Sequence, residues 1–171
     1  SLHDALPIYR IKAYQAVASF ISDYPNQKGV YLYGQFGVGK SYMMAAMANE
    51  LAGKGISTTL IHYPSFISES SGFDELKTKA NEVKKVDVLV LDDIGAESNN
   101  DWIRDNILQV ILQYRMQENL ATFFTSNLTM VELEQHLAMT KKGDETWPAK
   151  RVMERVHKLS DEYLLAGENR R

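Results

Sequence analysis

Residues 34–41, GQFGVGKS, have the spacing of a loop that cradles phosphate groups. Gly34, Gly39, Lys40 and Ser41 satisfy the pattern G-x-x-x-x-G-K-[ST], and Gly37 adds another glycine. Glycines let backbone N–H groups turn toward phosphate oxygens, a lysine places a charge at the β and γ groups, and the hydroxyl can ligate Mg²⁺. A plain glycine-rich turn is the alternative. The pattern predicts an ATP site formed by Gly34, Gln35, Phe36, Gly37, Val38, Gly39, Lys40, Ser41 and Tyr42.

Two aspartates close the apolar stretch VDVLVLDD at residues 86–93. A carboxylate at the end of a buried strand is costly unless it meets a cation or a polar partner, so we expect Asp92 to bind Mg²⁺ together with Ser41. Asp93 stands where hydrolytic phosphate-loop enzymes place the carboxylate that polarises water, usually a glutamate. The alternative is that Asp93 only caps the turn. Because aspartate is shorter by a methylene, we expect slow or partner-dependent ATP hydrolysis.

Further polar residues suggest catalytic roles. Asn127 follows the apolar run ATFFTS, and in phosphate-loop enzymes with an extra strand beside the loop this position can touch the γ-phosphate or the attacking water. A turn residue is the alternative. Arg151 and Arg155 are four positions apart and share one face of a predicted helix. From the spacing alone, an ordinary solvent-exposed face is the favoured interpretation. The alternative is that an arginine reaches the nucleotide of a neighbouring subunit.

A lysine-rich segment follows residues 57–63. The side chains that could grip a single strand by phosphate contacts and stacking are Tyr63, Phe66, Lys77, Lys79, Lys84 and Lys85. Because Glu75 and Glu82 alternate with the lysines, an exposed helix face is the simpler reading. We expect His62, Trp102 and Trp147 to be packing residues, and Met43, Met44 and Met47 to fill the core behind the phosphate loop.

These residues need a scaffold of alternating strands and helices. Apolar runs predict strands at 30–33, 57–63, 86–93 and 121–127, with a short fifth strand near 163–166. Helical spacing predicts helices at 9–24, from 42 to 53, around 73–83, at 101–117, at 130–138 and at 149–159. The core faces that we expect are Ile11, Tyr14, Val17 and Ile21; Met43, Met47 and Leu51; Phe73, Leu76, Ala80 and Val83; and Trp102, Ile103, Ile107, Val110, Ile111 and Tyr114. Thr129 with Glu132 forms a capping-box pattern. The alternation predicts an α/β fold with a mainly parallel five-stranded sheet, and ligands bind such sheets at the carboxyl ends of the strands.

Composition limits the classes of protein. The 171 residues suit one domain, and no run approaches the length that spans a membrane. The chain has no cysteine, which excludes disulfides and thiolate metal sites and agrees with a cytoplasmic location. A net charge of −3 argues against coating nucleic acid by bulk charge but allows a local basic strip. We set residues 1–8, SLHDALPI, apart as a candidate non-native leader because a common sequencing-adapter sequence translates to this octapeptide, and expect one domain over 9–171.

The blocks GQFGVGKS, LVLDDIGAE, ILQYRMQENLATFFTSN and AKRVMERV, with GENRR at the end, together resemble the AAA+ domain of bacterial replicative-helicase loaders of the DnaI type. The resemblance implies a P-loop, three-layer αβα fold with a minimal or absent lid. It implies Walker A at 34–41, Walker B at Asp92 and Asp93, sensor 1 at Asn127, an arginine finger at Arg155 with Arg151 beside it, and a sensor 2 arginine at Arg170.

The same resemblance implies partners. Loaders of this type bind ATP and single-stranded DNA, engage the hexameric DnaB-type helicase, and associate with one another through the ATP site. It assigns DNA binding to a helical insertion at about residues 63–85, and it leads us to expect that the N-terminal helicase-binding domain is missing here. The alternatives are an IstB-type transposition helper ATPase, a small-molecule P-loop kinase, and a nucleotide-switched adaptor that hardly hydrolyses ATP.

Overall fold

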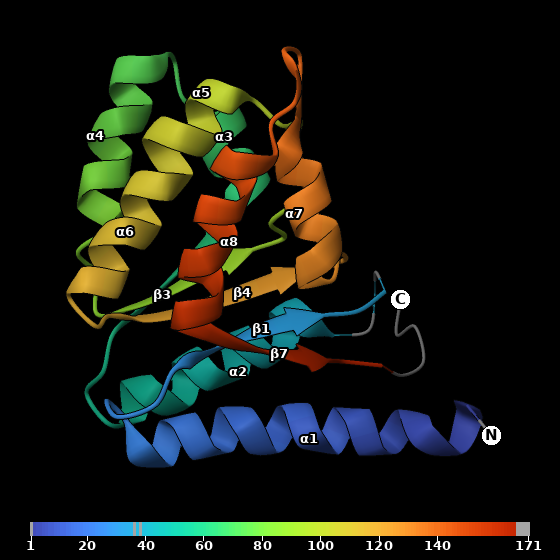
Figure 1. Ribbon diagram of the computed structural model, residues 1–171. Coiled ribbons are helices and arrows are strands. Elements are labelled where there is room, and N and C mark those ends of the chain that lie inside the picture. The colour runs from blue at the N-terminus through green and yellow to red at the C-terminus, as the bar shows by residue number, and fades with distance from the viewer. Residues whose placement is uncertain (1, 36, 38, 167–171) are drawn as a thin grey trace.

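The computed structural model describes residues 2–35, 37 and 39–166 and contains alternating helices and strands (Figure 1). The strands are β1 (Gly29–Tyr33), β2 (Thr58–His62), β3 (Val88–Asp92), β4 (Ala121–Ser126), β5 (Met139–Thr140), β6 (Gly143–Asp144) and β7 (Ser160–Leu164). The helices are α1 (Leu2–Asp23), α2 (Lys40–Gly53), α3 (Tyr63–Ser68), α4 (Phe73–Val83), α5 (Asp101–Ile103), the π-helical segment η1 (Arg104–Leu108), α6 (Gln109–Gln117), α7 (Met130–Ala138) and α8 (Thr146–Leu159).

Five strands form one parallel sheet in the order β2-β3-β4-β1-β7. The predicted α/β class and the five-stranded sheet are therefore confirmed. β4 lies between β1, which leads into the phosphate loop, and β3, which ends at Asp92. Because all five strands run the same way, the loop, the aspartates and Asn127 meet at one edge of the sheet.

Helices cover both faces of this sheet and make the three layers that we expected (Figure 1). Successive strand side chains point to opposite faces, so Val30 and Leu32 pack with α1 and α2, whereas Tyr31 packs with the helices of the other face. Met43, Met44 and Met47 are buried, as predicted. No helix follows β7 within the described residues, which end at Ala166.

Two expected core faces are wrong in part, although Val17 and Ile21 of α1 and Leu76 and Ala80 of α4 are buried as predicted. Ile11 and Tyr14 of α1 are 52 % and 46 % exposed, while Ala13 and Phe20 are fully buried. The helix carries apolar residues on more than one side, so its sequence is compatible with two different buried faces. The face that packs against the sheet contains Ala13, Val17 and Phe20. Phe73, at the start of α4, is 54 % exposed.

A π-helical turn explains a third error. The predicted helix at 101–117 forms as the run α5-η1-α6, but Val110 is exposed and Leu108 and Leu112 are fully buried. A π turn holds more than the 3.6 residues of an α turn, so it shifts the downstream residues to another face of the helix. The shifted face also buries Arg115, at the end of α6.

A short hairpin separates α7 from α8, and α8 leads back to the main sheet at β7. Thr129 and Glu132 form the predicted capping box of α7, and β5 pairs antiparallel with β6 before α8 begins. Asn99 and Arg104 tie the hairpin down by hydrogen bonds to carbonyl oxygens at 137–139. Within the described residues, no helix is both long and apolar enough to cross a membrane.

Candidate nucleotide site

The phosphate loop joins β1 to α2, as the sequence predicts. The N–H of Gly34 donates to the carbonyl oxygen of Ser126 (3.2 Å), which ties the base of the loop to the end of β4. Gly37 and Gly39 have φ angles of 83° and 97°, in the left-handed region that favours glycine. The loop therefore ends at the N-terminus of a 14-residue helix, which favours negative charge. Phe36 and Val38 lie outside the described residues.

Lys40 is the buried cation of this edge. Its Nζ donates to the carbonyl oxygens of Gly34 (2.8 Å) and Gln35 (2.9 Å) and to Oδ1 of Asn127 (3.0 Å). Burial lowers the pKa of Lys40, against the opposing attraction of Asp93 and Asp92. The predicted phosphate lysine and the predicted sensor asparagine are thus within hydrogen-bond distance, although 87 positions separate them in the chain.

Ser41 and Asp92 form the second contact of the site. The hydroxyl of Ser41 donates to Oδ1 of Asp92 at 2.8 Å. The hydroxyl of Thr125, on β4, donates to the same oxygen at 2.7 Å. Asp92 is 7 % exposed, so these two donors compensate for its burial.

Asp93 turns away from the strand. Its φ angle of 61° is in the left-handed region, which is uncommon for a non-glycine residue. Its N–H donates to Oγ1 of Thr125 (2.8 Å), and Oδ2 lies 3.3 Å from Nε2 of His62. Nδ1 of His62 lies 2.7 Å from Oγ of Ser65, on α3. The side chain of Asp93 remains 33 % exposed.

His62 and Thr125 are residues of the site that the sequence prediction missed. His62 is not a packing residue, because its side chain is 47 % exposed and contacts Asp93. Thr125 contacts both aspartates through one hydroxyl. The sequence could have indicated both residues, because each is a polar residue near the carboxyl end of a strand that lies beside β3.

Arg155 and Arg151 lie apart from these residues. Arg155 donates from Nε to Oε1 of Gln113 (2.6 Å) and from Nη1 to the carbonyl oxygen of Arg151 (2.7 Å). Residue 159, one turn later, ends α8 and leads into the amino end of β7, whereas the phosphate loop follows the carboxyl end of β1. Within one chain the two arginines and the phosphate loop are therefore not brought together.

Tyr42 directly follows the loop and is 76 % exposed. Arg170 lies outside the described residues.

In the lysine-rich segment, Lys77 and Glu82 lie on an exposed helix face, as the simpler reading predicts, but the two aromatic rings suggested for stacking do not fit that role. Tyr63 is 1 % exposed and so cannot stack on a base, and Phe66 is partly buried against the core. Instead, Phe73 stacks on the half-buried Trp102 with ring centroids 4.2 Å apart. Nζ of Lys77 lies 6.0 Å from the centroid of the Trp102 ring.

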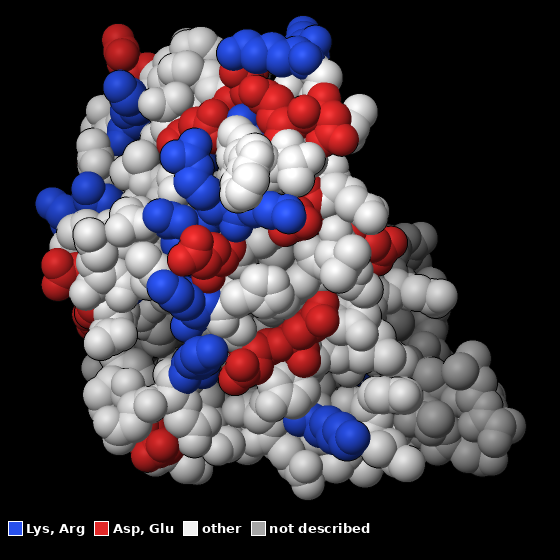
Figure 2. Space-filling view, viewed as in Figure 1, with Lys and Arg blue, Asp and Glu red and all other residues white. Residues whose placement is uncertain are grey.

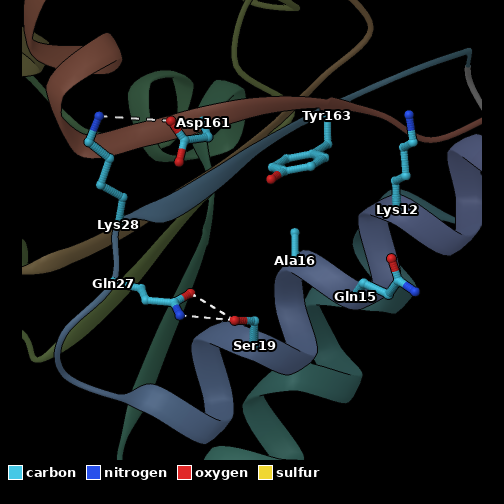
Figure 3. Close-up of a pocket in the computed structure, with 8 residues that line it drawn as sticks. All are labelled: Lys12, Gln15, Ala16, Ser19, Gln27, Lys28, Asp161 and Tyr163. Atoms are coloured by element: carbon cyan, nitrogen blue, oxygen red, sulfur yellow. Dashed lines mark hydrogen bonds and ion pairs between the residues drawn. The ribbon is translucent and has the colours of Figure 1, made fainter.

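A separate groove lies between α1 and β7 (Figure 3). It has a volume of about 430 Å³ and is polar, with Tyr163 pointing into it. Gln27 and Ser19 bond each other on one wall (2.9 Å), and Lys28 pairs with Asp161 on the other (3.8 Å). Because Lys28 precedes β1 and Asp161 is the second residue of β7, the groove lies toward the amino ends of the strands and is not part of the nucleotide site.

The chain is similar to several known proteins. The chain is 44% identical over 169 residues to the replicative helicase loader DnaI of Bacillus subtilis (strain 168), covering 95% of this chain and 54% of that protein. The crystal structure of a primosome component from Streptococcus pyogenes serotype M3 is 49% identical, with a TM-score of 0.77 and coverage of 95% of this chain and 82% of the other. A crystal structure of DnaI is 42% identical, with a TM-score of 0.83 and coverage of 94% and 84%.

The chain spans about half the length of the curated relatives that it matches. A family model described as IstB-like ATP binding protein matches residues 6–162, which include the phosphate loop, both aspartates, Asn127 and both arginines of α8. The chain therefore belongs to the family of IstB-like ATP-binding proteins.

Proposed function

We propose that this chain is the AAA+ ATPase domain of a replicative-helicase loader, which uses ATP to place a hexameric DnaB-type helicase on single-stranded DNA in the cytoplasm. The observation that carries the proposal is its identity of 42–49% with a DnaI structure and a primosome component, each covered for more than four fifths of its length. The contacts of Lys40 with Asn127 and of Ser41 with Asp92 supply the chemistry that such a domain needs.

Magnesium fits the pair formed by Ser41 and Asp92. Mg²⁺ prefers oxygen ligands at about 2.0–2.1 Å in an octahedron, in which neighbouring ligands are about 2.9 Å apart. Oγ of Ser41 and Oδ1 of Asp92 are already 2.8 Å apart. These two oxygens would hold the ion together with the phosphates of ATP, and the bound ion would neutralise charge on the phosphates.

The hydrolytic step requires a second copy of the chain. Asp93 would polarise the water, with Asn127 beside the γ-phosphate, whereas Arg155 is held on α8 by its bonds to Gln113 and to the carbonyl oxygen of Arg151. Arg155 of one copy would instead supply positive charge to the nucleotide of the next copy. Because an isolated chain lacks the neighbour's arginine and Asp93 is one methylene shorter than the usual glutamate, we expect hydrolysis to be slow and to rise as the chains associate through the ATP site.

Single-stranded DNA would bind beside α4. Phe73 is exposed and stacked on Trp102, and Lys77 stands over the indole, so this pair offers a flat surface for a base together with a charge for a phosphate. The other lysines of the segment, Lys79, Lys84 and Lys85, would add phosphate contacts.

ATP-dependent binding of a fluorescent single strand tests the proposal. Anisotropy is measured at about 50 and about 200 mM salt, because phosphate contacts weaken steeply with salt. We expect ATP to strengthen binding, Lys40→Ala to abolish the effect of ATP, and Phe73→Ala to weaken binding. Lys12→Ala, which removes an exposed lysine of α1, is the matched control.

A loading assay tests whether the chain acts on a DnaB-type helicase. Purified DnaB-type helicase is added to a circular single strand with or without this chain, and retained helicase is counted. ATP-dependent retention supports a loader. Binding of ATP and DNA with no effect on the helicase would favour the IstB-type helper, and DNA binding that follows ATP without turnover would favour the nucleotide-switched adaptor.

A further inference from the structure

The loop of residues 93–100 connects the nucleotide site to α5. Asp93 stands at its start, and Asn100 at its end caps α5, of which Trp102 is the second residue. Asp93 and Gly95 both have φ angles in the left-handed region, 61° and 97°. Because the loop leaves the sheet at Asp93, the contacts that hold the loop also limit where the carboxylate of Asp93 can lie.

The first part of the loop is fastened to the end of β4. The N–H of Ile94 donates to the carbonyl oxygen of Thr125 (3.0 Å), and Oγ of Ser126 donates to the carbonyl oxygen of Ile94 (2.6 Å). Gly95 lies so close to the residues before α7 that a Cβ atom there would come within 2.8 Å of Cδ1 of Leu128. These contacts hold the backbone at the start of the loop.

The last part of the loop is fastened to the end of α7. Nδ2 of Asn99 donates to the carbonyl oxygens of Leu137 (2.9 Å) and Met139 (2.7 Å). Between these two attachments, residues 96 and 98 are exposed, and Glu97 directs its side chain toward α7. Glu97 is therefore the residue that can hold the middle of the loop.

Glu97 is a buried carboxylate. Figure 2 shows Asp and Glu side chains spread among Lys and Arg over the visible surface of the molecule. The side chain of Glu97, in contrast, is only 8 % exposed, and burial of a carboxylate is costly unless polar partners compensate for it. Its Oε2 accepts from the N–H of Gly95 (2.8 Å), and its Oε1 lies 3.7 Å from Nε2 of His136, on α7. Among the described residues, His136 is the ion-pair partner recorded for Glu97.

The ring nitrogen of His136 is buried as well. Nε2 makes no hydrogen bond among the described residues, so the carboxylate of Glu97 is the group that can compensate for its burial. The charge of Glu97 also acts inside the core: burial raises the pKa of Tyr63, and Glu97 shifts it in the same direction. Two buried polar groups from distant segments therefore depend on each other.

We propose that Glu97 and His136 form a positioning pair, which holds the loop of residues 93–100 on α7 and keeps Asp93 in the place from which it polarises water. The inference rests on the proposed hydrolysis of ATP and adds the residues that position its carboxylate. Because α7 begins shortly after Asn127, the pair joins the loop of Asp93 to the helix that follows the proposed γ-phosphate contact. Both residues act through the backbone, and neither is a catalytic residue.

Steady-state phosphate release and titration of a fluorescent ATP analogue test the pair. Glu97→Gln keeps an oxygen for the N–H of Gly95 but removes the charge, and His136→Phe keeps a ring but removes its nitrogens. We expect each variant to lower kcat about fivefold to tenfold and to leave KM and nucleotide affinity unchanged, because the contacts of Lys40 involve neither residue. Glu50→Gln, which removes an exposed carboxylate of α2, is the matched control and should keep the wild-type kcat.

A double variant distinguishes a pair from two independent residues. Glu97→Gln combined with His136→Phe should lower kcat no further than the more damaging single change, because either change already breaks the pair. His136→Gln, whose amide can still donate to the carboxylate, should keep most of the wild-type kcat. Melting temperatures are measured for every variant. His136→Phe leaves a buried carboxylate unpaired and should melt lowest, whereas the double variant lacks that charge and should melt higher.

Three results would overturn the inference. A wild-type kcat in folded Glu97→Gln and His136→Phe, or losses of kcat that multiply in the double variant, would end the role of the pair and leave the proposed ATPase intact. A rise in KM with kcat unchanged would assign the two residues to ATP binding instead. A wild-type chain that binds ATP but never hydrolyses it, even with DNA and at high protein concentration, would overturn the proposed hydrolysis and this inference together.

Discussion

Nε2 of His62, at the end of β2, lies 3.3 Å from Oδ2 of Asp93, the residue that directly follows β3. The other ring nitrogen lies 2.7 Å from Oγ of Ser65, on α3. One imidazole therefore connects the carboxylate proposed to polarise water with the first helix of the segment proposed to bind DNA.

Replacing His62 should change turnover more than affinity. The contact holds one oxygen of Asp93 toward β2, so His62→Ala should free the carboxylate and raise kcat about threefold, with KM for ATP unchanged. Steady-state phosphate release measures both constants. The kcat of His62→Gln, which keeps a polar end group, should lie between those of the wild type and His62→Ala. A fall in kcat for His62→Ala would show that the contact supports catalysis.

Thr125 should be required for the arrangement of both aspartates. Thr125→Val removes the hydroxyl that donates to Asp92 and accepts from the N–H of Asp93, and the volume of the side chain hardly changes. We expect kcat to fall about tenfold or more, because misplaced catalytic groups lose transition-state contacts. Thr125→Ser should recover most of the activity. Equal activities of the Val and Ser variants would contradict the assigned role.

Arg155 should act on the nucleotide of another copy. Arg155→Ala should lower kcat by a factor of about 10²–10³ while leaving ATP affinity at low protein concentration unchanged. Lys40→Ala should bind no ATP, because it lacks the cation of the phosphate loop, but it retains Arg155. Mixing the two inactive variants should restore part of the activity, and a mixture that stays inactive at every ratio would speak against catalysis in trans.

Magnesium should be needed for turnover, through Ser41 and Asp92. Excess EDTA should stop phosphate release, and Asp92→Asn should raise the Mg²⁺ concentration needed for half-maximal activity about tenfold or more, because a carboxylate ligand is replaced by a weaker amide. Titration of Mg²⁺ at saturating ATP gives that concentration. An unchanged requirement in Asp92→Asn would remove Asp92 from the metal site.

Arg115 should matter for stability alone. It is fully buried and donates five hydrogen bonds, to Thr122 and to the carbonyl oxygens of Lys84, Val86, Asp87 and Ala121. Burial lowers the pKa of Arg115 to about 10, and the attraction of Asp87 opposes that shift. Arg115→Lys leaves several of these acceptors unpaired and should lower the free energy of unfolding by about 2–4 kcal/mol in urea titrations. Arg151→Lys, on the surface, should change it by less than about 0.5 kcal/mol.

The phosphate loop and the strands could be predicted from the sequence because they depend on residues close together in the chain. The phosphate loop could be recognised because its glycines, lysine and serine act within eight consecutive residues at a helix start. The strands were readable because short apolar runs end at polar residues, and parallel strands bring those ends to one edge. Asp92 and Asn127 were assigned by this rule, and both now contact residues of the loop.

The remaining features depend on contacts between distant segments. The sequence alone allowed two stripes on α1 and gave no sign of the π turn that moves Leu108 and Leu112 inward. It also gave no sign that Arg115 is buried, because that burial depends on carbonyl oxygens from two other segments. His62 and Trp147 were expected to pack, because aromatic rings usually do, but both are exposed. Only the tertiary structure decides such cases, since the free energy of burying a side chain depends on which partners the rest of the fold brings to it.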